Sequence, residues 1–320
     1  MPDAPEPRPR PTPPADLAAR ALELTAPFRD LYPFAPHFLA TGAGHLHYLD
    51  EGPADGAPIL ALHGNPTWSF YWRKAVRALA GDFRVVVPDH LGCGLSDKPR
   101  EWRYDLAGHV DNLEQLVLAL GLERITLLVH DWGGAIGMGL AARRPELVAR
   151  LAITNTAAFH GPVPRRILLC RTPVLGRLLV QGLNGFALPA TFLAVERPLE
   201  RRTRRALLAP YGTFASRLAL WKFVADIPTR PSHPTFAAIG AIADSLDRLA
   251  DRPTCILWGE RDWCFTPHFR REWQARFPGA EVHKHEDAGH YLMEDAGDAV
   301  ARELRDWLAR HPLRTAEAAR

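Results

Sequence analysis

Most of the chain repeats one pattern, in which a short run of Val, Ile and Leu is followed by a segment with helical periodicity. Continuous apolar runs that alternate with helices are typical of a parallel sheet covered by helices on both faces. The sequence therefore predicts an α/β fold. The runs predicted to be strands are HLHYLD (45–50), PILALHG (58–64), FRVVVPD (83–89), ITLLVHD (125–131), RLAITNT (150–156), PTCILWGE (253–260) and AEVHKHEDAGH (280–290).

This pattern is interrupted over residues 160–248, where strand-like alternation is absent and prolines separate several helical segments. An insertion between two strands of a parallel sheet lies over the carboxyl edge of the sheet, where such folds bind ligands. We therefore predict that 160–248 is a helical lid. The first residues, rich in proline and charge, are expected to be disordered. The predicted domains are a leader (1–32), a core (33–159 and 249–311), the lid between its two parts, and a tail (312–320).

The composition argues against several classes of protein. The 39 Lys and Arg residues nearly balance the 36 Asp and Glu residues, so the chain lacks the basic excess of a nucleic-acid-binding protein. The N-terminus has no signal-peptide core, and no stretch approaches the roughly 18 apolar residues of a membrane span. The cysteines Cys93, Cys170, Cys255 and Cys264 lack metal-ligand or redox spacing. We therefore expect a cytoplasmic protein with free thiols and no bound metal.

A strand-to-helix turn in LLVHDWGGAIG (127–137) supplies the candidate nucleophile. Residues Val129 to Gly133 fill the five places of the nucleophile elbow G-x-S-x-G, but Asp131 stands where serine is expected. A carboxylate is ionised at neutral pH, so it can attack without help from a base. Val129 fills a place that usually holds a small residue, which leaves open how tight the turn is. A helix-capping role for Asp131 is the alternative.

A base and an orienting acid are expected late in the chain, at the same edge of the sheet. His290 in DAGHYLMED directly follows the last predicted strand. Glu260 ends the preceding predicted strand and Asp262 lies two residues further on, in LWGERDWCF. Either carboxylate could orient the imidazole of His290. Spacing alone does not decide between these two. The order nucleophile, acid, histidine is the order that α/β-hydrolases use.

Two side chains near the predicted nucleophile can donate hydrogen bonds to an atom that gains negative charge. Asn65 in HGNPTWS offers a side-chain amide, and Trp132 offers an indole N–H. A turn before Pro66 and core packing are the respective alternatives. The G-x-G at Gly92 and Gly94 lacks a third glycine in register, so we predict no dinucleotide site.

These features together resemble the haloalkane dehalogenase branch of the α/β-hydrolases over about residues 33–308, through HGNPTWSFYWR, PDHLGCGLSDKP, VHDWGG, NTAAF, DIP and DAGHYLMED. The resemblance implies an α/β-hydrolase fold with a mostly parallel eight-stranded sheet. It assigns the nucleophile to Asp131 and the grip on the leaving group to Asn65 and Trp132. It assigns the acid to Asp262 and the base to His290. The alternative acid position of some relatives, in AITNTAAF, lacks a carboxylate.

Several stretches resemble more narrowly the β-lactone decarboxylases of bacterial long-chain olefin biosynthesis. These are TNTAAF, LGRLLVQGLNGFA, LAPYGTFASRLALWKFVADIP and WGERDWCF. The resemblance implies that a cis-β-lactone with two alkyl chains is converted to a cis-alkene and carbon dioxide without a cofactor. Attack of Asp131 at the lactone carbonyl and at the ring carbon both stay open. The apolar segment 167–195 is expected to line a tunnel for alkyl chains, with ordinary lid packing or an interface as the alternative.

Two other functions remain open at this point. The first is hydrolytic dehalogenation of a haloalkane by the same residues, and the second is a non-catalytic subunit of a hydrocarbon-biosynthesis assembly. Epoxide hydrolysis needs tyrosine donors from the lid, where Tyr211 is the only tyrosine. The expected partner is a small hydrophobic substrate. A homo-oligomer, peripheral membrane contact and a complex with other olefin-biosynthesis enzymes are left open.

Overall fold

The computed structural model describes residues 14–313, so the predicted disorder of the first residues and most of the predicted tail lie outside the described part. Within it, eight strands form one sheet in the order β1-β2-β4-β3-β5-β6-β7-β8. Strands β3 to β8 are parallel, whereas β2 is antiparallel to β1 and to β4, so the predicted mostly parallel sheet is confirmed. The strands are β1 (His37–Thr41), β2 (Gly44–Glu51), β3 (Pro58–Leu62), β4 (Arg84–Pro88), β5 (Ile125–Asp131), β6 (Val148–Thr156), β7 (Thr254–Gly259) and β8 (Glu281–His285).

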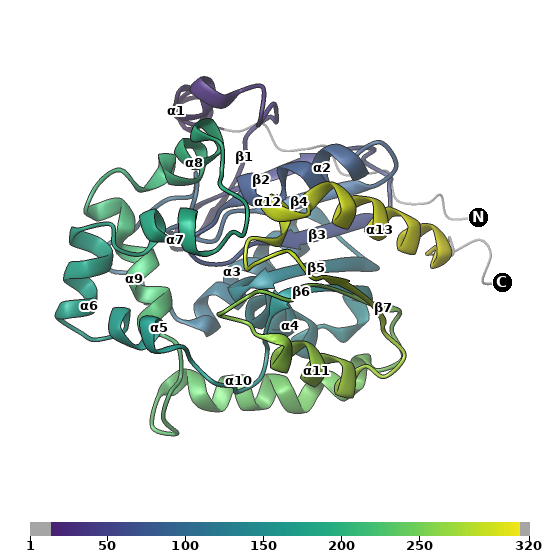
Figure 1. The fold of residues 1–320 in the computed structure, drawn as a ribbon. Helices are drawn as coiled ribbons and strands as arrows, with labels where there is room; N and C mark the ends of the chain where they lie inside the picture. The colour runs from purple at the N-terminus through teal and green to yellow at the C-terminus, as the bar shows by residue number, and fades with distance from the viewer. Residues whose placement is uncertain (1–13, 314–320) are drawn as a thin grey trace.

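Helices cover both faces of this sheet (Figure 1). Alternate side chains of β5 enter different cores: Leu127 and Val129 belong to one hydrophobic cluster, whereas Leu128 belongs to the other. All three side chains are fully buried, and each such burial stabilises the fold by about 1.5–3 kcal/mol. The core helices are α2 (Arg73–Leu79), α3 (Leu106–Leu120), α4 (Trp132–Arg143), α11 (Pro267–Arg276), α12 (Leu292–Asp295) and α13 (Gly297–Arg310), with the short 3-10 helices η2 (Ser69–Trp72) and η3 (Pro145–Leu147).

Helix α4 begins directly after Asp131, and its main helical neighbour is α3. The N-cap of α3 is Asp105, whose side chain accepts a hydrogen bond from the backbone N–H of Gly108 at 2.9 Å. A cap of this kind stabilises a helix by about 1 kcal/mol. The start of α3 is thus fixed by its own sequence, and the packed α3–α4 pair holds the β5–α4 turn in place.

The segment between β6 and β7 contains helices and no strand in the described chain, and these helices lie beside the sheet at the left and bottom of Figure 1. We keep 160–248 as the proposed limits of the lid. Its helices are α5 (Arg165–Cys170), α6 (Leu175–Arg177), η4 (Leu178–Gly182), α7 (Ala187–Leu193), α8 (Arg201–Leu208), η5 (Ala209–Tyr211), η6 (Ala215–Arg217), α9 (Leu218–Ala225), α10 (Pro234–Ser245) and η7 (Leu246–Leu249). None of the helices within residues 14–313 is long and apolar enough to cross a membrane.

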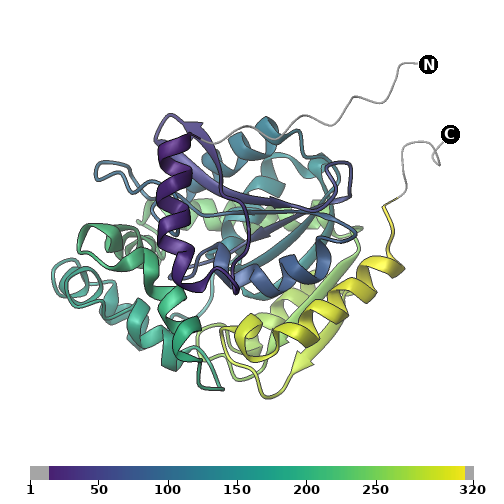
Figure 2. The ribbon, with the colours of Figure 1, turned by 90° about the horizontal axis from the view of Figure 1, so that it is seen from above.

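The predicted leader contains structure that sequence periodicity did not indicate. Helix α1 (Ala15–Thr25) and the short η1 (Ala26–Phe28) lie beside the lid and contact η5 and α8 (Figure 2). Phe28 is buried, and its ring packs edge-on against Trp68 and Phe70 of the core. Tertiary contacts of this kind, rather than a long amphipathic pattern, hold the segment in place.

Candidate active site

The turn between β5 and α4 places Asp131 in an unusual backbone conformation, with φ of 50° and ψ of −127°. A non-glycine residue in this region costs about 1–3 kcal/mol and occurs where the surrounding structure enforces it. The turn is therefore tight even though Val129 fills its first place. Helix α4 leaves room for that side chain at Gly137, where a Cβ would lie 3.0 Å from Cγ1 of Val129.

The Asp131 carboxylate is buried and held by the neighbouring loop. Its Oδ1 accepts a hydrogen bond from the backbone N–H of Asn65 at 2.6 Å. A Cβ at position 64 would fall 1.9 Å from this oxygen, so only glycine leaves space for the carboxylate. The Asp131 side chain makes no capping hydrogen bond to α4, which argues against the capping alternative.

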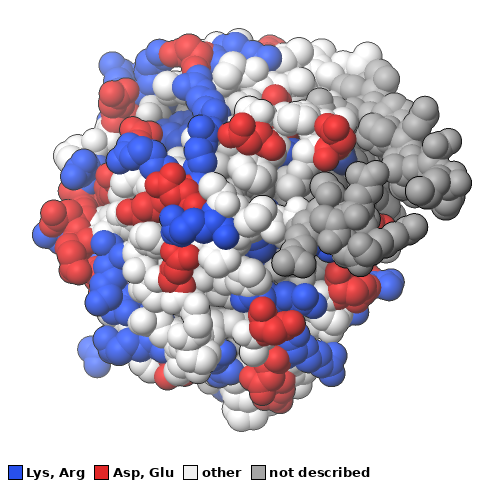
Figure 3. Space-filling view, turned by 90° about the vertical axis from the view of Figure 1, so that its right-hand side faces the viewer, with Lys and Arg blue, Asp and Glu red and all other residues white. Residues whose placement is uncertain are grey.

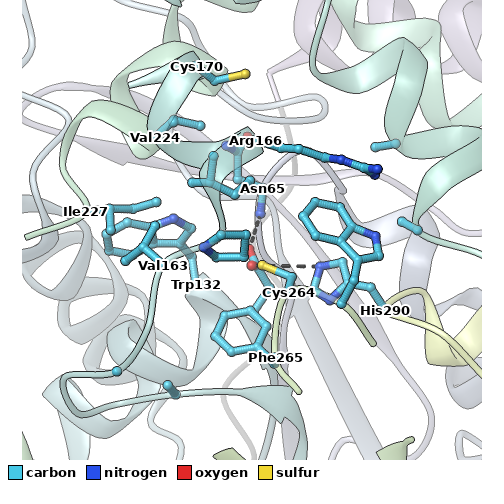
Figure 4. Close-up of a pocket in the computed structure, with 18 of the residues that line it drawn as sticks. Asn65, Trp132, Val163, Arg166, Cys170, Val224, Ile227, Cys264, Phe265 and His290 are labelled. Carbon is cyan, nitrogen blue, oxygen red and sulfur yellow. Dashed lines mark hydrogen bonds and ion pairs between the residues drawn. The ribbon is translucent and has the colours of Figure 1, made fainter. Parts of the chain in front are cut away.

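His290 and Asp262 form a hydrogen-bonded pair beside this carboxylate. Nδ1 of His290 lies 2.9 Å from Oδ2 of Asp262. Nε2 of His290 lies 3.8 Å from Oδ2 of Asp131, just beyond hydrogen-bond distance. The structure therefore brings together the three residues that the sequence pointed to as nucleophile, acid and base. Figure 4 shows the His290 ring directed toward the centre of the cavity.

The charges of the three groups influence one another. Burial raises the pKa of Asp131 above its ordinary value of 3.8, while the nearby His290 opposes this rise. Burial acts to lower the pKa of His290, but the carboxylates of Asp262 and Asp131 outweigh it and hold the pKa above 6.5. The two carboxylates therefore favour the protonated form of the His290 imidazole.

Glu260, the other sequence candidate for the acid, points to a different partner. Its Oε1 lies 2.5 Å from Nε of Arg270, and both side chains are largely buried. Glu260 is thus occupied by an ion pair, and the geometry selects Asp262.

Two residues of the site were missed by the sequence reasoning. Nδ2 of Asn155 donates to Oδ2 of Asp262 at 3.0 Å, and the same side chain bonds the backbone N–H and carbonyl of Gly259. Nε2 of His130 donates to the backbone carbonyl of His290 at 2.9 Å. Burial lowers the pKa of His130 well below 6.5, so this imidazole is neutral. A polar residue at the end of an apolar strand was the available signal for both.

The two predicted donors line the cavity beside Asp131. Nδ2 of Asn65 donates one hydrogen bond to the backbone carbonyl of Leu220 at 3.0 Å, which leaves its second N–H for a ligand. The ring of Trp132 is half-buried and lies 5.5 Å from that of Phe223. Their role as donors stays a prediction.

An apolar cavity of about 220 Å³ opens above these groups, between the core and the lid (Figure 4). The hydroxyl of Tyr211 does not reach it, because it donates to the carbonyl of Thr67. Burial raises the pKa of the Cys264 thiol far above its usual range, so Cys264 stays a neutral thiol in this wall. The main apolar side chains of the cavity are Phe159, Val163, Ile167, Phe186, Pro189, Leu193, Val224, Ile227, Phe265 and Phe269.

The lid segment that was expected to line a tunnel contributes Ile167, Cys170 and part of 185–194 to this cavity. No cluster of three or more His, Cys, Asp or Glu side chains placed to hold a metal ion occurs within residues 14–313. The arrangement places a buried carboxylate, a hydrogen-bonded imidazole and an apolar cavity side by side.

A family model described as the alpha/beta hydrolase fold matches residues 57–297. The chain therefore belongs to the α/β-hydrolase family, which confirms the predicted fold. It is 44% identical over 286 residues to a cis-3-alkyl-4-alkyloxetan-2-one decarboxylase of Shewanella oneidensis, and the alignment covers 87% of this chain and 89% of that protein. A protein of the same name from Xanthomonas campestris pv. campestris is 41% identical, with 88% and 98% of the two chains covered.

The fold also matches a solved structure of the dehalogenase branch. Haloalkane dehalogenase DbeA from Bradyrhizobium elkani USDA94 superimposes with a TM-score of 0.80 at 28% sequence identity, covering 90% of this chain and 100% of that chain. The resemblance drawn from the sequence motifs is therefore confirmed, as is the prediction of an enzyme of this fold.

Proposed function

We propose that this protein decarboxylates a cis-dialkyl β-lactone to a cis-alkene and carbon dioxide, with Asp131 as nucleophile and without a cofactor. The observation that carries the proposal is the buried Asp131 carboxylate, which lines an apolar cavity and faces the paired His290. The two decarboxylase relatives support the choice of substrate.

In the first proposed step, Oδ2 of Asp131 attacks the ring carbon that bears the ring oxygen. A C–O bond to Asp131 forms, the ring C–O bond breaks, and its electron pair leaves as a carboxylate on the substrate. Attack at the lactone carbonyl would instead give an anhydride and an alkoxide. The alkoxide oxygen would then have to be transferred to Asp131 before it could leave, so attack at the ring carbon is the shorter route.

In the second step, the bond between the new carboxylate and its carbon breaks. The electron pair forms the carbon–carbon double bond, Asp131 leaves as a carboxylate, and carbon dioxide is released. The step consumes neither water nor an oxidant. A protonated His290 stabilises the charge that returns to Asp131, and its raised pKa suits this task. Hydrolysis would instead require a neutral His290 to activate water.

Asn65 and Trp132 are the proposed donors to the oxygens of the opening lactone. Both line the cavity beside Asp131, and the second N–H of the Asn65 amide is available for this bond. Asp262 is the proposed acid that orients His290 and keeps it charged. A fixed donor contributes most to the rate when it is directed at an atom that gains negative charge in the transition state, and the oxygens of the opening lactone are such atoms.

The cavity supports a substrate with alkyl chains, because its walls are mainly aliphatic and aromatic. Its lid wall comes from the apolar segment 167–195, in which α5 and α7 turn Ile167 and Leu193 inward. Dialkyl lactones would bury their chains along this wall while the ring lies against Asp131.

Hydrolytic dehalogenation of a haloalkane is the second candidate function. It is favoured by the close structural match to haloalkane dehalogenase DbeA. The same nucleophile, acid and base would serve, with water as the second substrate. The two decarboxylase relatives, at 44% and 41% identity, support fragmentation over hydrolysis.

The deciding experiment incubates wild type and Asp131→Ala separately with a synthetic cis-dialkyl β-lactone and with a bromoalkane. Alkene is measured by gas chromatography and bromide by an ion assay. We expect alkene from wild type alone. Bromide without alkene would assign the protein to the dehalogenases. Neither product, together with unchanged alkene output in cells that carry Asp131→Ala, would identify a non-catalytic subunit.

We also propose a cytoplasmic location, supported by four cysteines that are free thiols. A homo-oligomer and a complex with other olefin-biosynthesis enzymes stay predictions. Cell fractionation with antibody detection tests the location. We expect the protein on the cytoplasmic side of the cell membrane and none in the extracellular or periplasmic fractions.

A further inference from the structure

The outer surface of the lid carries a group of exposed aliphatic side chains, which we call the lid patch. They come from α5, α6, η4 and the adjoining loops, and these elements contact one another in succession. Val174 is 83% exposed and Leu183 is 68% exposed. Exposed apolar side chains that gather on neighbouring elements are typical of an interaction site. The lid patch consists of Leu168, Leu169, Val174, Leu175, Leu178 and Leu183.

The segment that carries the lid patch is basic. Residues 147–195 contain no Asp or Glu, whereas arginines occur at 165, 166, 171 and 177, among the members of the patch. The whole lid, 160–248, contains 13 Lys and Arg against five Asp and Glu, although the complete chain has a net charge of only +3. The face of the molecule away from the lid carries both signs of charge interspersed (Figure 3). The basic excess is therefore concentrated on the lid.

We propose that the lid patch docks on the surface of a lipid bilayer that contains anionic lipids. Its aliphatic side chains would enter the bilayer interface, and the arginines of the same segment would bind lipid phosphates while their stems stay on the apolar surface. A second copy using the same face would bring two basic surfaces together, which disfavours self-association there.

Part of the lid patch lies on α5, a helix that also lines the cavity. In α5, Ile167 and Cys170 line the cavity, whereas Leu168 and Leu169 are exposed. Docking would therefore place one wall of the cavity directly on the lipid. A lactone with two long alkyl chains partitions into lipid, so it could enter the cavity without crossing water. This delivery role rests on the proposed function, whereas the docking itself does not.

The test of docking is flotation of the purified protein with vesicles of phosphatidylcholine, with and without phosphatidylglycerol. The double variant Val174→Asp/Leu178→Asp places charge in the lid patch without touching the cavity walls. Leu118→Asp is the matched control, because Leu118 is a 48% exposed leucine on α3 of the core. Wild type and control should float with the anionic vesicles, and less so with neutral vesicles or added salt. The double variant should bind about tenfold more weakly or worse.

A second measurement compares alkene formation from a long-chain lactone embedded in these vesicles with that from a short-chain, water-soluble lactone. The double variant should be slowed about tenfold with the embedded substrate and unchanged with the soluble one. Failure of wild type to float, or equal flotation of the double variant, would overturn the proposal. The proposal would also be overturned if wild type formed an oligomer through the lid patch, or bound an acidic protein there, and the double variant did not. Absence of alkene from both substrates would refute the proposed chemistry and leave the flotation result standing.

Discussion

Replacing Asp262 with asparagine should lower both the stability of the protein and the pKa of His290. Each carboxylate oxygen of Asp262 accepts two hydrogen bonds. Oδ1 accepts from the backbone N–H groups of Cys264 and Phe265 at 2.6 and 3.0 Å. Oδ2 accepts from His290 and Asn155 at 2.9 and 3.0 Å. In the wild-type protein, all four partners act as donors.

The size of the effect follows from this count. An asparagine that turns its NH2 group toward Cys264 and Phe265 loses two hydrogen bonds. Turned toward His290, it loses only the bond from Asn155, because a neutral imidazole can accept at Nδ1. Hydrogen bonds to a charged group contribute about 1.5–3 kcal/mol each, so the less costly orientation loses about 1.5–3 kcal/mol. A typical protein is stabilised by roughly 5–15 kcal/mol. His290 also loses its strongest favourable charge contact, so burial should bring its pKa below 6.5.

Urea unfolding measures the first effect, and an NMR titration of the His290 ring measures the second. Glu260→Gln is the control, because Glu260 pairs with Arg270 and should leave the pKa of His290 where it is. The reasoning is refuted if the unfolding free energy of Asp262→Asn stays within about 1 kcal/mol of wild type. An unchanged pKa of His290 would refute it equally.

Three further predictions concern pH and the site of attack. The rate of decarboxylation should fall as pH rises through the pKa of His290, which lies above 6.5, because the imidazolium is lost. It should also fall at low pH, as Asp131 is protonated. A rate that increases with pH across neutrality would contradict the role of the imidazolium. A lactone labelled with 18O in the ring should deliver the label to carbon dioxide, whereas label found on Asp131 by mass spectrometry after one turnover would show attack at the carbonyl. Burial lowers the pKa of His109 to about 3, so it is neutral when folded and takes up a proton on unfolding below 6.5. Stability should therefore drop as pH falls from 6.5 toward 3, by up to about 5 kcal/mol from this group, and less in His109→Phe, as urea unfolding at several pH values would show.

The sequence was sufficient for the central strands, because each is buried on both faces and is therefore continuously apolar. It was less informative where contacts at a distance decide the structure. Strand β1 has one buried residue in five, and α1 is held by contacts with the rest of the molecule. Neither segment has a periodic pattern long enough to stand out from a loop.

The active site shows the same division. Asp131 and His290 were indicated by their position at strand ends, which fixes them at one edge of the sheet. The choice between Glu260 and Asp262 depended on which way each side chain turns within one short loop. The hydrogen bond of Asp262 to His290 and the ion pair of Glu260 with Arg270 decide it. Asn155 was not predicted because it does not carry the chemistry itself: its side chain supports Asp262.

The hydrogen bond from the backbone of Asn65 to Asp131 bears on how new activities could arise on this scaffold. In an ordinary serine hydrolase, the corresponding backbone N–H belongs to the oxyanion hole and binds an oxygen of the substrate. Here the nucleophile itself occupies that donor. Shortening the nucleophile, as in Asp131→Ser, would vacate the donor while His290 and Asp262 remain in place. A single substitution would thereby bring together the components of an esterase. In this family, whether the nucleophile or the substrate accepts the hydrogen bond from this backbone N–H would then separate carboxylate chemistry from hydroxyl chemistry.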